Sequence, residues 1–174
     1  MKFMILGSKT IRRLLRREDG GALAELAILV PFLAVMLAAV CEIGRFFQNY
    51  TTLAKATRTA SRYLSNHAIN DLEVGRANNL AYCGKLVCAV GDPPLVNGLN
   101  LDNICIETTG SPKVTSVTVR IPRPLTPCNP VAGAPAAKPY IFRPIFDIGA
   151  LLNNPSASMA LPIAPSTTMY YMID

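Results

Sequence analysis

An uncharged stretch over residues 26–41, which directly follows a lone carboxylate at Glu25, constrains this chain more than any other feature. With residues 21–24 it reaches the ~20 apolar residues that a helix needs to cross the ~30 Å hydrocarbon core of a bilayer. A carboxylate at the entrance of such a helix is costly unless a positive group pairs with it. The sequence therefore predicts a membrane-spanning helix whose first turn has an electrostatic role.

Positive charge is concentrated before this apolar run. Residues 1–20 contain six Lys or Arg and two acidic residues, a net charge of +4, whereas the whole chain of 174 residues carries +6. Because Lys and Arg beside a span are retained in the cytoplasm, we expect a cytoplasmic N-terminus and a single pass through the membrane. No basic patch with interleaved aromatic residues follows, so the charge does not indicate nucleic-acid binding.

An ordinary secretory signal peptide has a similar layout, with a basic segment, an apolar segment and a cleavage site. The site here would be Ala38, Ala39 and Val40, which places a β-branched residue where a small one is required. Cys41 offers a lipoprotein site, but Ala38 and Val40 fit that pattern poorly. We therefore expect the apolar segment to be retained.

The helical pattern continues beyond Cys41. Apolar residues recur at three- and four-residue steps, and charged or amide residues lie between them. The predicted apolar face is Ile43, Phe46, Phe47, Tyr50, Leu53, Ala54, Thr57, Ala60, Tyr63 and Leu64, and the polar face is Glu42, Arg45, Gln48, Asn49, Lys55, Arg58 and Arg62. The prediction is one helix over about 22–64, transmembrane in its first half and amphipathic in its second. Pro31 removes a backbone donor, so a kink is expected there.

Short motifs along this helix carry a family resemblance. A Gly20–Gly21 pair precedes Glu25, which would be the fifth residue after a cut between the glycines. The matching pieces, in order, are residues 24–27, the apolar run with Pro31, residues 42–45 and residues 54–63. In this order they resemble the TadE-like family, small pilin-like proteins of tight-adherence (Flp, type IVb) pili. The chain departs from the common pattern at Leu26, where such proteins often have an aromatic residue.

The resemblance implies a processing and assembly mechanism. Residues 1–20 would be a basic prepilin leader that a prepilin peptidase removes by cutting between Gly20 and Gly21. The new ammonium group would then pair with Glu25 of a neighbouring subunit, which offsets a cost on the order of 3 kcal/mol for a carboxylate in lipid. Alternatively, Glu25 lies solvated among the headgroups, since it is only four residues into the span. The implied partners are other pilin subunits, the Tad assembly machinery, the peptidase and the inner membrane.

The remaining residues, 66–174, are predicted to form a small β-rich head outside the cytoplasm, after a stalk that ends near residue 65. Alternation over residues 114–121 places Val117, Val119 and Ile121 on one face of the clearest strand. Residues 167–172 predict a final strand, and residues 140–148 are either a strand or a short helix broken by Pro144. Six prolines make residues 122–139 a loop or extended linker. The predicted fold class is α+β and pilin-like.

Four of the five cysteines lie in the predicted head, at Cys83, Cys88, Cys105 and Cys128. Crosslinks suit a small domain with a limited core, and each contributes ~2–4 kcal/mol. Of the three possible pairings, proximity in sequence favours Cys83–Cys88 and Cys105–Cys128. A zinc site is the competing interpretation, but the first spacing is wide for zinc and no second close pair exists. No metal or other cofactor is expected, and Cys41 is interpreted as a small packing residue.

Nothing in the sequence predicts catalysis. His67 is far from any cluster of ligands or catalytic partners and is interpreted as a solvated or capping residue. Glu42 and Arg45 are three residues apart, so they either pair locally or contact other subunits. Phe46 and Phe47 are assigned to helix packing or to the membrane interface.

Two functional interpretations follow. The first is a structural minor pilin or pseudopilin that acts in assembly, priming or adhesion of a type IVb pilus. The second is a monotopic envelope protein whose uncut helix anchors a partner-binding head. A mature N-terminus at Gly21 distinguishes the first from the second.

Overall fold

The computed structural model describes residues 19–126, 128–131, 137–147, 153–154, 158 and 160–173. The chain divides into two compact units, Met1–Ile43 and Gly44–Asp174. The predicted basic leader, apart from its last two residues, lies outside the described residues. One helix, α2 (Asp19–Ser65), contributes residues to both units and runs without interruption through Pro31. The predicted helix of about 22–64 is therefore confirmed, with one further residue at its C-terminal end and three at its N-terminal end.

In the first unit, the apolar part of α2 is almost entirely exposed. Each large apolar side chain between Leu23 and Val40 is more than half exposed, from 51% at Met36 to 77% at Ile28. The helix is long and apolar enough to cross a membrane, with a mean hydropathy of 2.6 over its most apolar window. Length and composition therefore agree with the sequence prediction of a transmembrane-capable helix.

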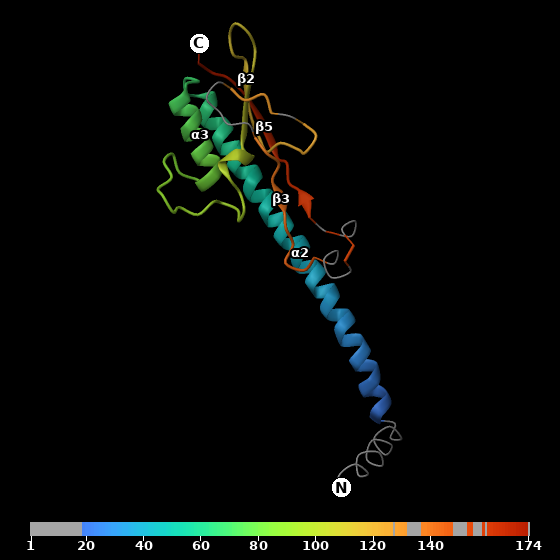
Figure 1. Ribbon diagram of the computed structural model, residues 1–174. Coiled ribbons are helices and arrows are strands. Elements are labelled where there is room, and N and C mark those ends of the chain that lie inside the picture. The colour runs from blue at the N-terminus through green and yellow to red at the C-terminus, as the bar shows by residue number, and fades with distance from the viewer. Residues whose placement is uncertain are drawn as a thin grey trace. The chain divides into compact units, whose positions relative to one another are not determined.

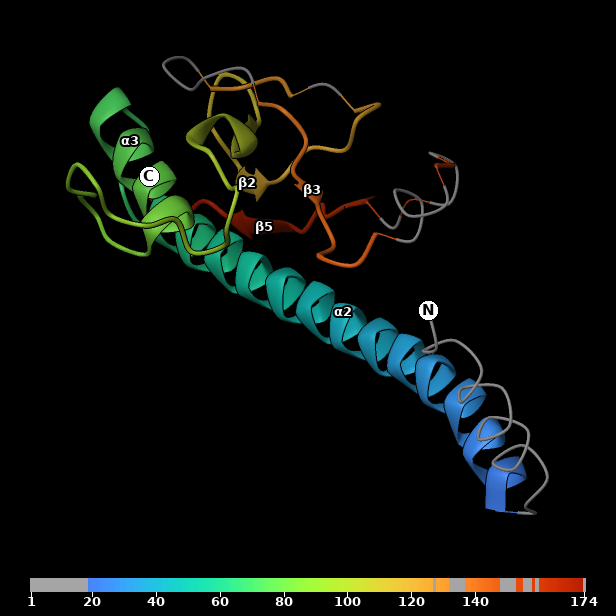
Figure 2. The same ribbon diagram turned by 60° about the horizontal axis from the view of Figure 1, so that its bottom comes forward.

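The second unit is the head, which includes the C-terminal part of α2. Its elements after α2 are α3 (Asp71–Cys83), η1 (Leu101–Asn103), β1 (Cys105–Thr109), β2 (Ser116–Arg120), β3 (Ile141–Phe142), β4 (Leu161–Pro162) and β5 (Ser166–Tyr170). Figure 1 shows α3 beside the end of α2, and β5 running along α2. Figure 2 shows α3 and β5 beside α2 from another side. The predicted α+β class is therefore confirmed.

The main sheet is antiparallel with the order β1-β2-β5. Val117 pairs with Thr108 and Met169, and Val119 pairs with Ile106 and Thr167. Val117 and Val119 are fully buried whereas their neighbours in β2 are half-buried, as strand alternation requires. The predicted strands around 114–121 and 167–172 are thus present, and β3 and β4 form a separate two-stranded pair.

A loop of six residues, 110–115, joins β1 to β2 and begins at Gly110. Its φ of +109° is a conformation that other residues rarely adopt. A Cβ at this position would also collide with the carbonyl oxygen of Lys113. Glycine is therefore required here on both grounds.

Helix α3 was not predicted from the sequence. Its N-cap is Asn70, whose side chain accepts a hydrogen bond of 2.9 Å from the backbone N–H of Glu73. Its C-terminal end is closed by Gly84 in the left-handed conformation, at φ 78°. Only three apolar residues, Val74, Ala77 and Ala81, are buried along it, so its hydrophobic period is weak in the sequence.

Two hydrophobic clusters form the core of the head. The first lies between α2, α3 and the main sheet, and includes Ala60, Leu64, Val74, Ala77, Ala81, Ile104, Ile106, Val117 and Val119. The second lies nearer residue 46 of α2, and includes Leu53, Val96, Leu99, Ile121, Tyr140, Phe142 and Ile163. Both clusters contain residues of α2, so the amphipathic half of this helix is an integral part of the head core.

Polar residues on the buried side of α2 bind β5. Ser61 Oγ donates to the Thr167 carbonyl oxygen over 2.9 Å, and the hydroxyl groups of Thr57 and Thr167 are 3.2 Å apart. Thr57 and Ser61 are at most 1% exposed, so these bonds satisfy groups that would otherwise be costly to bury. Met172 N–H also donates to the carbonyl oxygen of Ser65, which ties the strand to the end of the helix.

Candidate functional site

The predicted cleavage junction lies in the first turn of α2. Gly20 and Gly21 are both helical, and a Cβ built at Gly21 would meet nothing within 4 Å. Packing in the monomer therefore gives no reason for a glycine at position 21, where glycine weakens a helix by about 1 kcal/mol relative to alanine.

Glu25 is one turn further along and is exposed. Within the part of the chain that the structure describes, it forms no ion pair and no side-chain hydrogen bond. The nearest large apolar side chains in sequence, Leu23 and Leu26, are 64% and 56% exposed. If the apolar run lies in lipid, this carboxylate needs either headgroup water or a cation from another molecule.

The two predicted faces of the amphipathic half require a correction. Ile43, Phe47 and Tyr50 were assigned to the packing face, but they are 60%, 64% and 43% exposed. Glu42 was assigned to the polar face, yet it is 3% exposed. The head covers a stripe that includes Phe46, Leu53, Thr57, Ala60 and Leu64 from the predicted apolar face, together with Ala56 and Ser61. Small residues on this stripe allow β5 to approach the helix closely. Their size therefore favours this stripe, and not the adjacent one through Phe47, as the face that the head covers.

Arg45 and Phe46 lie against Phe142 of β3. The Phe46 and Phe142 rings meet edge to face, with centroids 5.5 Å apart and planes at 86°. The Arg45 guanidinium carbon lies 5.8 Å from the Phe142 centroid, within the range of a cation–π contact. Phe46 therefore packs within the head, whereas Phe47 is 64% exposed.

Both disulfides join the cysteines that are neighbours in sequence, Cys83 with Cys88 and Cys105 with Cys128. These are the two pairings favoured by sequence proximity. Cys105, Cys128 and Glu107 also lie together as potential metal ligands, but both sulfurs are used in the disulfide. Cys41 is free and exposed, so its packing role finds no support within the described chain.

Glu107 clamps the second disulfide to the sheet. Its carboxylate accepts two hydrogen bonds from Arg120, of 2.7 and 3.0 Å, and one of 3.0 Å from the backbone N–H of Asn129. The Arg120 guanidinium and the Asn129 amide hold the pKa of Glu107 below its usual range. The clamp joins β1 and β2 to the segment that carries Cys128, where Val131 N–H also donates to the Ile106 carbonyl oxygen.

His67 caps α2, as one of the two sequence interpretations proposed. Its Nδ1 donates to the Tyr63 carbonyl oxygen over 2.7 Å, and its ring stacks on the Tyr63 ring with centroids 4.0 Å apart. The Tyr63 hydroxyl donates to Glu73, which also pairs with Arg76 at 2.9 Å. Burial and the adjacent Glu73 carboxylate raise the pKa of Tyr63. The cluster therefore links α2 to α3.

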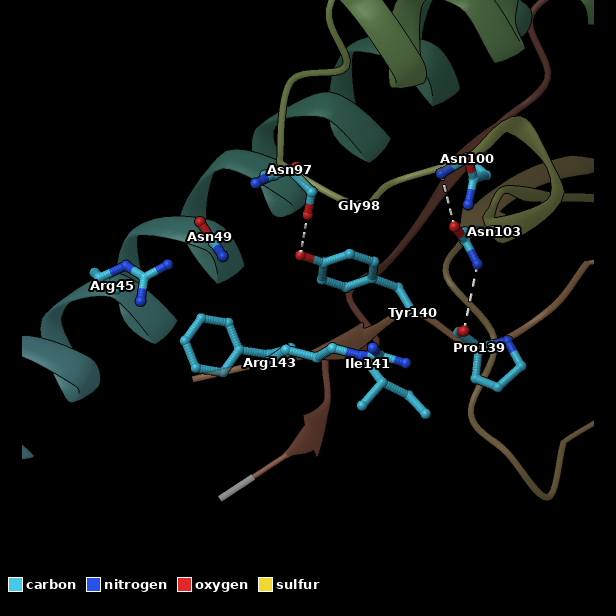
Figure 3. A pocket seen from close by; sticks show the side chains of 11 residues that line it. Arg45, Asn49, Asn97, Gly98, Asn100, Asn103, Pro139, Tyr140, Ile141 and Arg143 are labelled. Carbon is cyan, nitrogen blue, oxygen red and sulfur yellow. Dashed lines mark hydrogen bonds between the residues drawn. The ribbon is translucent and has the colours of Figure 1, made fainter. Parts of the chain in front are cut away.

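A pocket of about 460 Å³ in the head was not anticipated from the sequence. It lies between α2, the loop around Asn97 and β3 (Figure 3). Its residues come from segments 45–49, 97–103 and 139–143, which are separated in sequence and carry no motif. Only the fold brings them together, so periodicity and spacing gave no signal for this site.

The structure combines a long helix, exposed and apolar in its first half, with a small α+β head that contains two disulfides. The family model described as TadE-like protein matches residues 20–62. The match covers α2 from the glycine pair nearly to its end, and confirms the resemblance drawn from the helix motifs. No curated protein and no solved structure matches the chain.

Proposed function

We propose that this protein is a minor pilin or pseudopilin of a type IVb tight-adherence pilus, processed between Gly20 and Gly21. The observation that carries the proposal is the contrast in exposure along α2. The head covers the second half of the helix, whereas large apolar side chains from Leu23 to Val40 stay exposed. A structural subunit accounts for this contrast, because lipid would cover the exposed apolar side chains before assembly and neighbouring helices would cover them afterwards.

Glu25 gives the assembly its register in this proposal. Cutting between Gly20 and Gly21 would create an ammonium group four residues before the carboxylate. Pairing the Glu25 carboxylate with the ammonium group of a neighbour removes the cost of an uncompensated charge in lipid, which is on the order of 3 kcal/mol. Subunits that are shifted along one another would leave both charges unpaired, so the pair selects one alignment.

The exposed residues Ile43, Phe47 and Tyr50 extend this docking surface beyond the apolar run. They are spaced by four and then three residues, the step of a helix-packing stripe. They lie on a part of α2 that the head leaves open, since each is at least 43% exposed. We propose that neighbouring helices contact this stripe, while the head provides the surface displayed outside the membrane.

Co-expression of the full chain with and without a prepilin peptidase tests the proposal. Intact-mass measurement of the membrane fraction should give a chain that begins at Gly21 only when the peptidase is present. A Gly20→Val variant, which enlarges the residue before the cut, should remain uncleaved. An unchanged mass in both conditions would contradict the proposal and favour an uncut anchor with a partner-binding head.

A further inference from the structure

The main sheet of the head ends at β5, which is an edge strand in the order β1-β2-β5. Two backbone hydrogen bonds define which residues of this strand face β2. Ile121 N–H donates to the Pro165 carbonyl oxygen, and Tyr171 N–H donates to the Thr115 carbonyl oxygen. In this antiparallel register the odd-numbered residues of β5 therefore direct their backbone groups toward β2, and the even-numbered residues direct theirs away from it.

The other edge of β5 is unpaired in the part of the chain that the structure describes. Its backbone N–H and C=O groups, which no described residue hydrogen-bonds, belong to Ser166, Thr168 and Tyr170. Met172 is the next residue in the same alternation, and its N–H donates to the Ser65 carbonyl oxygen of α2. The unpaired edge therefore lies on the side of β5 that meets the end of α2. Such an edge is a template for a further strand.

A groove of about 810 Å³ lies between this edge and α2, and we call it the β5 groove. Its lining consists of Arg58, Thr59, Arg62, Ser65, Asn66, Thr168, Met169, Tyr170 and Met172, all of them in the head unit. The Thr57 hydroxyl contacts that of Thr167, and about two turns later Ser65 contacts Met172. The helix and the strand therefore run in the same direction beside the groove (Figure 1).

The α2 side of the β5 groove is positively charged. Arg58 and Arg62 are exposed and four residues apart, so they lie one turn apart on the same side of the helix. Within the described residues neither guanidinium forms an ion pair or a hydrogen bond, and the described lining contains no carboxylate. Two copies of this chain paired edge to edge would bring these arginines together, and like charges oppose such pairing. The charge therefore favours an acidic occupant over a second copy.

The spacing of the two arginines fits an extended chain. Four residues of helix α2 rise by about 6 Å. Side chains on one face of a strand are two residues apart, which is about 6.7 Å. Acidic residues at alternate positions of an added strand can therefore each lie beside one guanidinium. The residues between them face solvent, as the side chains of Thr168 and Tyr170 do in β5.

We propose that the β5 groove binds an extended acidic segment of a partner protein, which adds to β5 as a further strand of the main sheet. The N–H and C=O groups of Thr168 and Tyr170 bind its backbone, and Arg58 and Arg62 bind alternate Asp or Glu side chains. The proposal concerns the head unit alone. It depends neither on cleavage, nor on membrane insertion, nor on filament assembly.

Fluorescence anisotropy of a labelled peptide tests the charge preference, with the full chain in a neutral detergent. The peptide has about seven residues, the length of a short strand, with glutamate and threonine in alternation. It should bind at least tenfold more tightly than the same peptide with lysine in place of glutamate. Arg58→Gln and Arg62→Gln should each weaken binding at least threefold, whereas Arg123→Gln, at an exposed residue outside the groove, should leave it unchanged. Equal binding of the two peptides, or equal effects of the three substitutions, would overturn the proposal.

Methylation of the peptide nitrogens separates strand addition from attraction by charge alone. In an extended peptide the N–H groups of the glutamates point to one edge and those of the threonines to the other. Only one of these sets can face β5. Methylating that set should weaken binding at least tenfold, and methylating the other should leave it nearly unchanged. Equal binding of both methylated peptides would overturn strand addition.

Native mass spectrometry of the same sample tests whether a second copy occupies the groove. The free chain should show no dimer that the glutamate peptide dissociates. A dimer that disappears when the peptide is added, and that Arg62→Gln strengthens, would overturn the acidic partner in favour of a second copy.

Discussion

The two halves of α2 contain similar apolar residues but are covered in opposite ways. Leu53, in the head, is 1% exposed, whereas Leu33, in the apolar run, is 53% exposed. The head supplies the partners of Leu53 from the same chain, including Val96, Leu99 and Ile163. Leu33 has no such cover from the described residues of the head. One helix therefore serves as core for its own domain in its second half and, in the proposed function, as a docking surface for lipid and other subunits in its first half.

The largest contrast is expected from the same substitution in both halves. Leu53→Ala removes a fully buried side chain and should lower the free energy of unfolding of the head by about 3 kcal/mol. Leu33→Ala should change it by less than about 0.5 kcal/mol, because no part of the head core is lost. Urea unfolding in mild detergent, followed by near-ultraviolet circular dichroism of the six tyrosines, measures both. Equal destabilisation by the two variants would contradict the division between the halves.

The disulfides sharpen the comparison because both lie in the head. The chain-entropy model gives about 3.4 kcal/mol for a loop of about 23 residues, such as that closed by Cys105–Cys128, and about 2 kcal/mol for a loop of about five, such as that closed by Cys83–Cys88. Replacing both cysteines of a pair by alanine should therefore cost more for the longer loop, as measured by the same urea titration. Cys41→Ala, in the exposed half, is the matched control and should leave the titration unchanged.

The exposed half should matter for assembly instead. Glu25→Ala should still be cut between Gly20 and Gly21, yet its incorporation into surface filaments should fall at least tenfold, which corresponds to about 1.4 kcal/mol. Quantitative immunoblotting of sheared filaments against the membrane fraction measures this ratio. Glu25→Asp, which keeps the charge, should recover part of the incorporation. Normal incorporation of Glu25→Ala would remove the charge-pairing proposal.

The smallest effect concerns the pH dependence of the head. The pKa of Glu107 is lowered in the folded state, chiefly by its hydrogen bonds from Arg120. Its contribution to stability is therefore complete above the unfolded-state pKa of about 4.3 and is lost as the pH falls through the lower folded pKa. Glu107→Gln should flatten the stability profile between about pH 5 and pH 3 relative to the wild type.

Glu25→Gln is the control for that profile, since Glu25 lies outside the head unit. The pH dependence of head unfolding should be the same for Glu25→Gln and the wild type. Asp92, whose pKa is also lowered by Lys85, contributes to the slope in all three proteins. Only the difference between Glu107→Gln and the wild type therefore reports on the clamp. Identical profiles for all three proteins would contradict a stabilising role of the Glu107–Arg120 pair.

The sequence was sufficient for features that depend on long or local patterns. The apolar run and its continuation predicted α2, alternation around Val117 and Val119 predicted β2, and proximity favoured the observed disulfides. Helix α3 was missed because Gly75, Asn78 and Asn79 interrupt the helical spacing of its few apolar residues. Its capping signals, Asn70 with Glu73 and Gly84 at the end, were nevertheless present in the sequence.

The covered face of α2 and the pocket were beyond sequence reasoning for a different reason. Two apolar stripes run side by side on the second half of the helix, one through Phe46 and one through Phe47. Periodicity identifies both as apolar but does not say which one the head covers. That choice depends on the contact of Phe46 with Phe142 and on the hydrogen bond of Ser61 with Thr167. In each pair the two residues are about a hundred positions apart in sequence and meet only in the folded chain.

Oxidative crosslinking in membranes tests most directly whether neighbouring helices complete the exposed face of α2. The experiment compares Phe47→Cys with Gln48→Cys, both in a Cys41→Ser background and with the peptidase and assembly system present. Phe47→Cys should yield a disulfide-linked species of higher mass, and Gln48→Cys, at the adjacent exposed polar position, should yield at least fivefold less. Equal crosslinking at both positions, or none at either, would contradict the account.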